Sequence, residues 1–345
     1  MRKTWVKKWM IKSSGLLIAL ICLVISETGV TAYAQTPGGF SIRAVIPDNQ
    51  LDTKQTYFDL RMKPGEEQKL QIVINNSQPV ELETEVRLNA ASTGRNGLIV
   101  YTEPDVRDEN LKVAITDVAS LETQKVTVPP LGSETVTIEL KMPEEPFDGV
   151  ILGGIAVTGI DTGNGTQATE GVSLNNTITY VIGLKLTENE NEVEPDFDLA
   201  SITPSLINYR TAVVAALHNK APLIVKDIDI NAQVYRKGSN AVLHELILNG
   251  AEMAPLSKGD FVIDWGGETL KPGTYRLKMT ANYEGKTWEW DKEFTITSEA
   301  NDLNKEALGI KKDYRWLYLL LGLAILVIIS NIAYRMGKRR KNDKG

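Results

Sequence analysis

Cysteine is almost absent from this chain of 345 residues, and Cys22 is the only one. It lies in an apolar run close to the amino terminus, and the sequence after it contains none. Beyond that run the chain therefore has no disulfide, no thiolate nucleophile and no thiolate metal ligand. A protein of this size without disulfides must be stabilised by ordinary hydrophobic cores.

Histidine is nearly as scarce, with only His218 and His244. Neither belongs to a His-Glu-x-x-His motif, so no metal site is expected. Asp161-Thr162-Gly163 resembles the active-site triplet of aspartic proteases, but that chemistry needs two carboxylates and the chain has one such triplet. No nucleophile elbow, phosphate loop or dinucleotide fingerprint is present. The sequence therefore predicts a protein that is not an enzyme and needs no cofactor.

Positive charge is missing from the long middle of the chain. The whole chain has a net charge of −6, whereas the first 34 residues carry five basic and one acidic residue and the last 35 carry nine basic and two acidic. Residues 35–310 therefore carry a net charge of −17. A surface this acidic excludes nucleic acid and anionic lipid as partners of the middle part, because both require a positive field.

The amino terminus has the pattern of a secretory signal peptide. Basic residues precede the apolar run from Gly15 to Ser26, and Ala32-Tyr33-Ala34 forms a small-x-small cleavage site. We expect residues 1–34 to be removed, so that the mature chain begins at Gln35.

A second apolar run, residues 316–334, contains no charge and is long enough to cross a bilayer. As a helix it spans roughly 28 Å. More basic residues follow it than precede it, which indicates that the tail 335–345 is cytoplasmic. The sequence thus predicts a single-pass type I membrane protein whose exterior part is linked to the helix by a spacer, residues 299–315.

The exterior part reads as short strands. Residues 80–88 alternate apolar and polar side chains, which is typical of a strand with one wet face, and 150–158 are more uniformly apolar, as in a central strand. The acidic stretch 189–196 separates two such units, 35–188 and 197–298. We predict an all-β protein with two immunoglobulin-like β-sandwich domains in tandem, and we expect the second to fold alone.

Aromatic residues are the remaining candidates for binding. Trp288 and Trp290 lie two residues apart and therefore on one face of a strand, and Trp265 precedes two glycines. Exposed tryptophan is favoured at protein interfaces, so all three are candidate partner-binding residues. The alternative is that at least one of them fills the sandwich core.

Phe147-Asp148-Gly149 forms a second candidate, between Pro146 and the apolar strand. Glycine permits close approach of a ligand and phenylalanine offers a flat face, so these three residues are a candidate recognition loop. The alternative is a tight turn that only begins the strand.

Several motifs occur in an order that resembles the WxL-interacting protein family of Gram-positive bacteria. Those in the first unit are Asn49-Gln50, Tyr57-Phe58-Asp59-Leu60, Pro64-Gly65, Asn75-Asn76, Gly97 with Tyr101, Pro143 and the run from Phe147 to Gly154. Those in the second unit are Met253-Ala254-Pro255-x-Ser257, Pro272-Gly273-x-Tyr275 and Trp288-x-Trp290 with Phe294-x-Ile296. One departure is Leu256, where the family resemblance leads us to expect asparagine.

The resemblance implies a cell-surface adaptor. In such a protein the first domain binds peptidoglycan and the second binds host matrix proteins, with WxL surface proteins as partners. Phe147, Asp148 and Gly149 are then candidate peptidoglycan contacts, and the role of the loop from Met253 to Ser257 stays open. An alternative from the residues themselves is a non-catalytic accessory or sensor subunit of a membrane complex, although the short tail has no room for an output domain.

Overall fold

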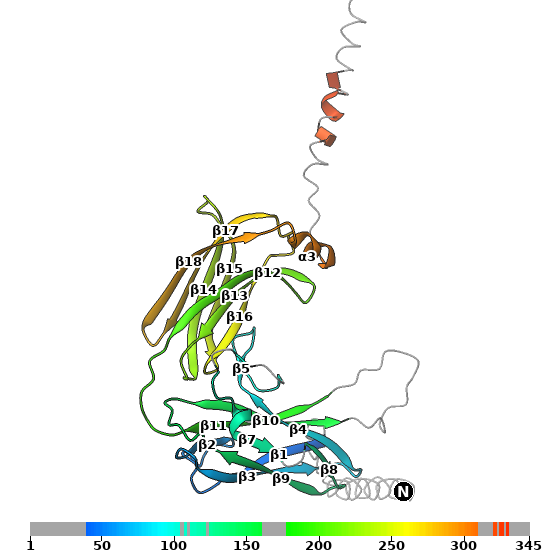
Figure 1. Cartoon of the computed structure of the whole chain (residues 1–345). Helices are drawn as coiled ribbons and strands as arrows, with labels where there is room; N and C mark the ends of the chain where they lie inside the picture. Colours follow the sequence, from blue (N-terminus) through cyan, green and yellow to red (C-terminus); the bar gives the residue numbers. More distant parts are fainter. Residues whose placement is uncertain are drawn as a thin grey trace, which may run out of the picture.

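The structure is a computed structural model, and it describes residues 39–103, 107–108, 111–121, 124–160, 177–309, 320–322, 324–327 and 329–330. The predicted signal peptide and most of the predicted membrane span lie outside these residues. Two β-sandwiches follow one another along the chain, and α3 (Ala300–Glu306) lies at the far end of the second (Figure 1). The prediction of an all-β chain built from sandwich-like sheets is confirmed.

The first sandwich packs a four-stranded sheet, β1-β3-β9-β7, against a five-stranded sheet, β2-β11-β10-β4-β8. Its elements are β1 (Phe40–Val45), β2 (Phe58–Arg61), β3 (Glu67–Asn76), β4 (Leu82–Ala90), α2 (Ile115–Val118), β7 (Ala119–Leu121), β8 (Lys125–Val128), β9 (Ser133–Lys141), β10 (Ile151–Ile160) and β11 (Thr179–Thr187). The alternation predicted for β4 is seen, because Leu82, Thr84 and Val86 are buried between the sheets. β10 lies between β11 and β4, and its apolar sequence fits burial on both faces, because Gly153 faces Ile115 on one side and Gly154 faces Tyr101 on the other.

The second sandwich packs the sheet β12-β13-β16-β5-β6 against the sheet β15-β14-β17-β18. Its elements are β12 (Phe197–Ile207), β13 (Arg210–Asn219), β14 (Val225–Arg236), β15 (Val242–Met253), β16 (Ser257–Asp264), β17 (Gly273–Tyr283) and β18 (Lys286–Ile296). A separate core fills it, formed among others by Val213, Ile230, Phe261 and Leu277.

Two strands of the second sandwich come from the first part of the chain. After β4 the chain leaves the first sandwich and forms β5 (Ser92–Thr93) and β6 (Ile99–Val100), a hairpin that we call the crossover hairpin. β5 pairs in parallel with β16, and Gly259 lies opposite Thr93. Figure 1 shows β5 between the two bodies. The expectation that residues 197–298 fold alone therefore conflicts with a sheet that the first unit completes.

The acidic segment 188–196 has no strand or helix and passes from β11 to β12. It contacts both sandwiches through ion pairs, because Glu190 lies 2.7 Å from Arg61 of β2 and Glu194 pairs with Lys286 of β18. The segment is therefore held against the body of the protein, and its composition alone predicts a freer linker than the one observed.

In the part of the chain that the structure describes, no helix has the length and apolarity required to cross a membrane. The described residues of the predicted span are helical, and apolar side chains among them, such as Leu320, Ile325 and Leu326, are more than half exposed.

Candidate functional site

The crossover hairpin enters the second sandwich at the loop from Met253 to Ser257. The Thr93 hydroxyl oxygen accepts a hydrogen bond from Ala254 N at 3.0 Å and lies 2.6 Å from Ser257 Oγ. Ser257 Oγ donates to Ala254 O at 2.8 Å, so the Thr93 hydroxyl is the donor to Ser257. All three residues are buried, and every polar atom of this network is satisfied. The loop whose role the sequence left open thus receives the hairpin.

Gly97, at the tip of the crossover hairpin, makes the closest contact with β15. Its φ is +70°, its carbonyl accepts a hydrogen bond from Glu252 N at 2.7 Å, and an added Cβ would lie 2.7 Å from Leu248. Glycine is required here for both the backbone conformation and the space.

Leu256 adopts a backbone conformation that suits asparagine or glycine better than leucine. Its φ is +49°, in the left-handed region, and its N–H donates to the carbonyl of Ala221 at 3.1 Å. Asparagine is among the residues that tolerate this region, which gives a physical reason for the residue expected from the family resemblance. In this chain leucine occupies the position at a cost in backbone strain.

We expect Leu256→Asn to raise the free energy of unfolding of the exterior part by about 0.5–1 kcal/mol. Urea unfolding monitored by tryptophan fluorescence measures the change. Val80→Asn is the control, because Val80 is also apolar but is exposed, whereas Leu256 is half-buried, and Val80 is not in the left-handed region. A lower unfolding midpoint for Leu256→Asn than for the unchanged protein would contradict the strain assigned to Leu256.

His218 joins the two units by a polar contact. Its Nε2 lies 2.8 Å from Oδ1 of Asp108, and both side chains are almost fully buried. Among the described residues there is no group of three or more His, Cys, Asp or Glu side chains that could hold a metal ion. The geometry of His218 is that of a structural pair across the junction.

His244 stacks on Trp265 in the second sandwich, with ring centroids 4.1 Å apart. Burial lowers the pKa of His244 below its ordinary value of 6.5, while Glu268 and Asp264 act in the opposite direction. Protonation is therefore less favourable in the folded chain than in the unfolded chain. The stability that depends on this histidine is complete above pH 6.5 and falls as the pH drops below it.

We expect the denaturant midpoint to fall between pH 7.5 and pH 5.5 by more in the unchanged protein than in His244→Phe, which keeps the ring stack and does not titrate. His218 is present in both proteins, so the difference between them isolates His244. Equal pH dependence of the two proteins would contradict this account.

The predicted loop Phe147-Asp148-Gly149 lies at the junction between the units. Phe147 packs partly against the core of the first sandwich, and its N–H donates to Glu188 Oε2 at 3.0 Å. Asp148 accepts hydrogen bonds from Asn189 and Asn191 at 2.9 and 2.8 Å. The loop is therefore fixed by the segment 188–196, and its aromatic ring is directed largely toward the core.

Gly149 makes a close backbone contact with the second unit. Its φ is +89°, and an added Cβ would lie 2.2 Å from the carbonyl oxygen of Pro222. The next residue, Val150, donates its N–H to the same carbonyl at 2.9 Å. The glycine is thus explained by the close approach of two backbones.

The three predicted tryptophans differ in exposure. Trp265 is 3% exposed and belongs to the core, which leaves its ring unavailable to a partner in this structure. Trp288 and Trp290 are partly exposed, and Trp288 packs edge-on against Phe197 with centroids 4.9 Å apart. The structure brings Trp288 and Trp290 together on β18 and does not add Trp265 to them.

Two tyrosines lie side by side on the outer face of the sheet β2-β11-β10-β4-β8. Gly154 of β10 and Gly183 of β11 are directly opposite each other. A Cβ on Gly154 would lie 2.8 Å from Tyr101, and a Cβ on Gly183 would lie 3.6 Å from Tyr57. Because neighbouring strands are about 4.8 Å apart, the two rings cover adjacent positions of the sheet. Both rings are partly exposed.

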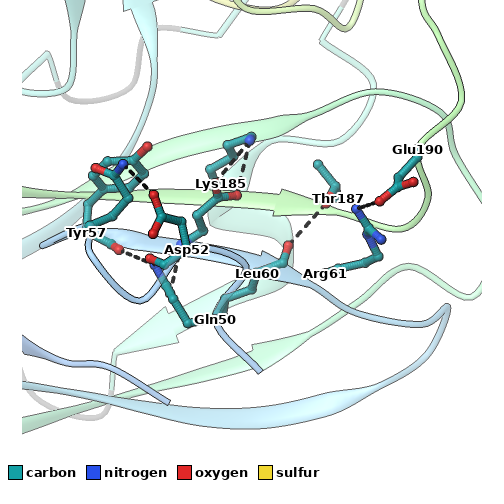
Figure 2. Close-up of polar contacts among 10 residues, drawn as sticks. Gln50, Asp52, Tyr57, Leu60, Arg61, Lys185, Thr187 and Glu190 are labelled. Carbon is teal, nitrogen blue, oxygen red and sulfur yellow. Dashed lines mark hydrogen bonds and ion pairs between the residues drawn. The ribbon is translucent and has the colours of Figure 1, made fainter. Parts of the chain in front are cut away.

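A row of charged pairs continues from Tyr57 along β2 and β11 (Figure 2). Lys185 Nζ lies 3.1 Å from Asp59 Oδ1, and Arg61, two residues further along β2, pairs with Glu190. The side chain of Gln50 fixes the loop before β2, since its Nε2 donates to Tyr57 O and its Oε1 accepts from Asp59 N. We call Tyr57, Tyr101 and the Lys185–Asp59 pair the tyrosine face.

A groove of about 370 Å³ borders the tyrosine face at the junction of the two units. Residues of both units and of the connecting segment line it, among them Arg61, Lys185, Asn189, Asn191, Leu223 and Tyr283. Its charged side chains include both signs, so it offers hydrogen-bond donors and acceptors without a strong field of either sign.

A second hollow, of about 490 Å³, lies over β3, β9 and α2. Its charged residues pair across the strands, with Lys69 2.7 Å from Glu139 and Lys141 3.1 Å from Glu67. These side chains are more than half exposed, which is the arrangement of an ordinary solvated sheet face.

Comparison with known families now gives two matches. Residues 40–159 match the WxL Interacting Protein peptidoglycan binding domain, and residues 169–305 match the WxL Interacting Protein host binding domain. Together they cover well over half of the chain. It belongs to the WxL-interacting protein family. The resemblance read from the sequence motifs is thereby confirmed.

The boundary between the two matched regions does not coincide with the boundary between the two sandwiches of this WxL-interacting protein. The host binding match begins before β11, which pairs with β10 and β2 of the first sandwich. Conversely, β5 lies inside the peptidoglycan binding match and pairs with β16 of the second sandwich. Each matched region thus gives strands to the sandwich of the other.

Solved structures with weak similarity include chaperones and chaperone complexes. The CsuC–CsuE chaperone–tip adhesion subunit complex of Acinetobacter baumannii has 11% identity, a TM-score of 0.35, and coverage of 73% of this chain and 97% of that chain. The CupB2 chaperone of Pseudomonas aeruginosa has 14% identity, a TM-score of 0.27, and coverage of 66% and 91%. At these TM-scores the similarity says nothing about function. No curated protein sequence matches the chain.

The tyrosine face was not predicted from the sequence, although a signal for it exists. Tyr57, Tyr101 and Gly154 all belong to the motifs that carry the resemblance to WxL-interacting proteins, and the fold brings them together on one sheet face. Their separation along the chain hides that proximity from any local pattern.

Proposed function

We propose that this WxL-interacting protein is a membrane-anchored adaptor of the Gram-positive cell surface. Its first unit binds peptidoglycan, and its second unit binds host matrix proteins or WxL surface proteins. The observation that carries the proposal is the presence of a peptidoglycan binding domain and a host binding domain in one chain. The sandwich architecture and the satisfied polar networks fit a binding role.

Anchoring by residues 316–334 is part of the proposal. It is supported by the uncharged run of 19 residues, by the basic residues that follow it, and by the exposed apolar side chains of its described residues. Removal of residues 1–34 and a cytoplasmic tail complete this topology. Protease treatment of intact cells tests it, because an epitope at the carboxyl terminus must survive when the sandwiches are digested.

For the second unit we assign partner contacts to Trp288 and Trp290. Both are partly exposed and lie on β18 at the edge of the sheet β15-β14-β17-β18. Partly exposed tryptophan is enriched where proteins bind one another. Substitution of both by alanine should weaken capture of a WxL protein or a matrix protein, and Tyr209→Ala, which removes a 63% exposed aromatic ring elsewhere on the same unit, is the matched control.

Sedimentation of the exterior part, residues 35–309, with purified sacculi stripped of anionic polymers tests wall binding. This part is strongly acidic, so its net charge does not attract it to the wall and salt has no such attraction to screen. We therefore expect it to pellet with the sacculi to a similar extent at low and high salt. Failure to pellet at any salt concentration would remove peptidoglycan binding from the proposed function.

A further inference from the structure

We infer that the tyrosine face binds the sugar strand of the wall polymer, a chain of N-acetylated amino sugars, and not its peptide stems. This inference rests on the proposed function of the first unit and names the site and the part of the polymer that it contacts. It differs from the sequence-based candidate, the loop at Phe147.

The shape of the face is the first argument. Tyr101 lies over Gly154 and Tyr57 lies over Gly183, so both rings rest directly on the sheet backbone. Since Gly154 and Gly183 are paired, the two tyrosines occupy neighbouring positions on this sheet face. Sugar rings present flat C–H faces, and aromatic rings are the side chains that bury such faces while a polar group stays in water.

Hydrogen-bonding groups at the border are the second argument. Lys185 lies beside Tyr57 with its side chain 27% exposed and supplies a donor, the tyrosine hydroxyls can donate or accept, and the largely buried Asp59 holds Lys185 in place. Asn89 donates to the backbone carbonyl of Tyr101 at 2.8 Å and so fixes the segment that carries this ring. Hydroxyl and acetamide groups need such mixed donors and acceptors, held in place beforehand.

Charge decides between sugar and peptide. Peptide stems end in carboxylates, whose recognition favours a cation with no other partner. On this face Lys185 is paired with Asp59, and Arg61 is paired with Glu190. Burial raises the pKa of Tyr101, and the negative charge of Glu252 in the second unit raises it further. A neutral sugar is therefore favoured over an anionic stem at the same surface.

The competing explanation is that the tyrosines only fill the space above two glycines. Titration with defined probes distinguishes sugar binding from mere filling of space. The exterior part, residues 35–309, is titrated with the β-1,4-linked tetramer of N-acetylglucosamine and, separately, with a synthetic stem pentapeptide. We expect the tetramer to bind weakly and the pentapeptide not to bind.

Tyr57→Ala should reduce the affinity for the tetramer about tenfold or more, whereas Tyr57→Phe, which keeps the ring, should stay within about threefold of the unchanged protein. Tyr209→Ala is the control for loss of an exposed tyrosine. Unchanged affinity in a folded Tyr57→Ala protein would overturn the inference. Binding of the pentapeptide and not of the tetramer would also overturn it. So would a result in which Phe147→Ala reduces the affinity for the tetramer and Tyr57→Ala does not.

A measurement without substitution covers the case in which Tyr57→Ala does not fold. With tyrosine rings labelled for NMR, the tetramer should shift the ring signals of Tyr57 and Tyr101 and leave that of Tyr209 in place. Absence of any shift at Tyr57 and Tyr101 overturns the inference. If the protein shows no such shift but still pellets with sacculi, the proposed function stands and only the tyrosine face is excluded. If the protein does not pellet with sacculi, the proposed peptidoglycan binding itself is rejected.

Discussion

Residues 197–298 produced alone are expected to be at best partly folded, and the same segment supplied with the crossover hairpin is expected to fold cooperatively. Without the hairpin, β16 loses its neighbour β5, and the buried Ala254 N–H and Ser257 hydroxyl lose the Thr93 side chain. Each buried polar group left without a partner costs about 1–3 kcal/mol, so the loss of both contacts is on the order of 2–6 kcal/mol. That is a large share of the stability of an ordinary domain.

The measurement compares 197–298 with a fusion in which residues 91–101 are joined to it by a long flexible Gly/Ser segment. Tryptophan fluorescence reports on this unit, because Trp265, Trp288 and Trp290 all lie in it. A second fusion carrying Thr93→Val is the matched control and should recover only part of the stability. If 197–298 alone unfolds at the same denaturant concentration as the whole exterior part, the hairpin is not required.

Gly149→Ala is expected to destabilise the junction by about 1–3 kcal/mol more than Gly238→Ala. Both glycines have positive φ, +89° and +78°, so both substitutions carry the same kind of backbone strain, on the order of 1 kcal/mol. The two positions differ in the room available for an added Cβ. At Gly149 it would lie 2.2 Å from the Pro222 carbonyl oxygen, whereas at Gly238 no atom lies within 4 Å of it.

The clash at Gly149 involves backbone on both sides, so a side-chain rotation does not relieve it and the units must move apart. Urea unfolding of the exterior part measures both variants against the unchanged protein. An increased susceptibility of the segment 188–196 to protease should accompany Gly149→Ala. Equal destabilisation by the two substitutions would show that the approach of Gly149 to Pro222 is not tight.

The strands were predictable from the sequence wherever apolar and polar side chains alternate. This holds for β4 and, in the second sandwich, for β18, where Trp288 and Trp290 share their alternation with Phe294 and Ile296. The same alternation places the two tryptophans on the strand face that carries Phe294 and Ile296, which belong to the core. This shared face was the sequence signal that Trp288 and Trp290 are only partly exposed to a partner.

The crossover hairpin was not predictable from local pattern. β5 and β6 have two residues each, too few to show a period, and Thr93 pairs with residues more than 160 positions away. The tyrosine face was hidden for a related reason, because it depends on the register that sets Gly154 opposite Gly183. Long-range pairing of this kind is decided by tertiary contacts that no window of sequence contains.

Among the described residues the chain passes between the sandwiches into the crossover hairpin, out of it, and again through 188–196. In the proposed role the chain is held by the membrane at one end and by a partner at the other, so shear at the surface pulls on it. Here the pull cannot simply straighten a linker, because β5 must first slide out from beside β16 while the ion pairs at Glu190 and Glu194 break. In the proposed adaptor, tension that separates the two sandwiches must therefore break the β5–β16 pairing and these ion pairs before the connecting segments extend.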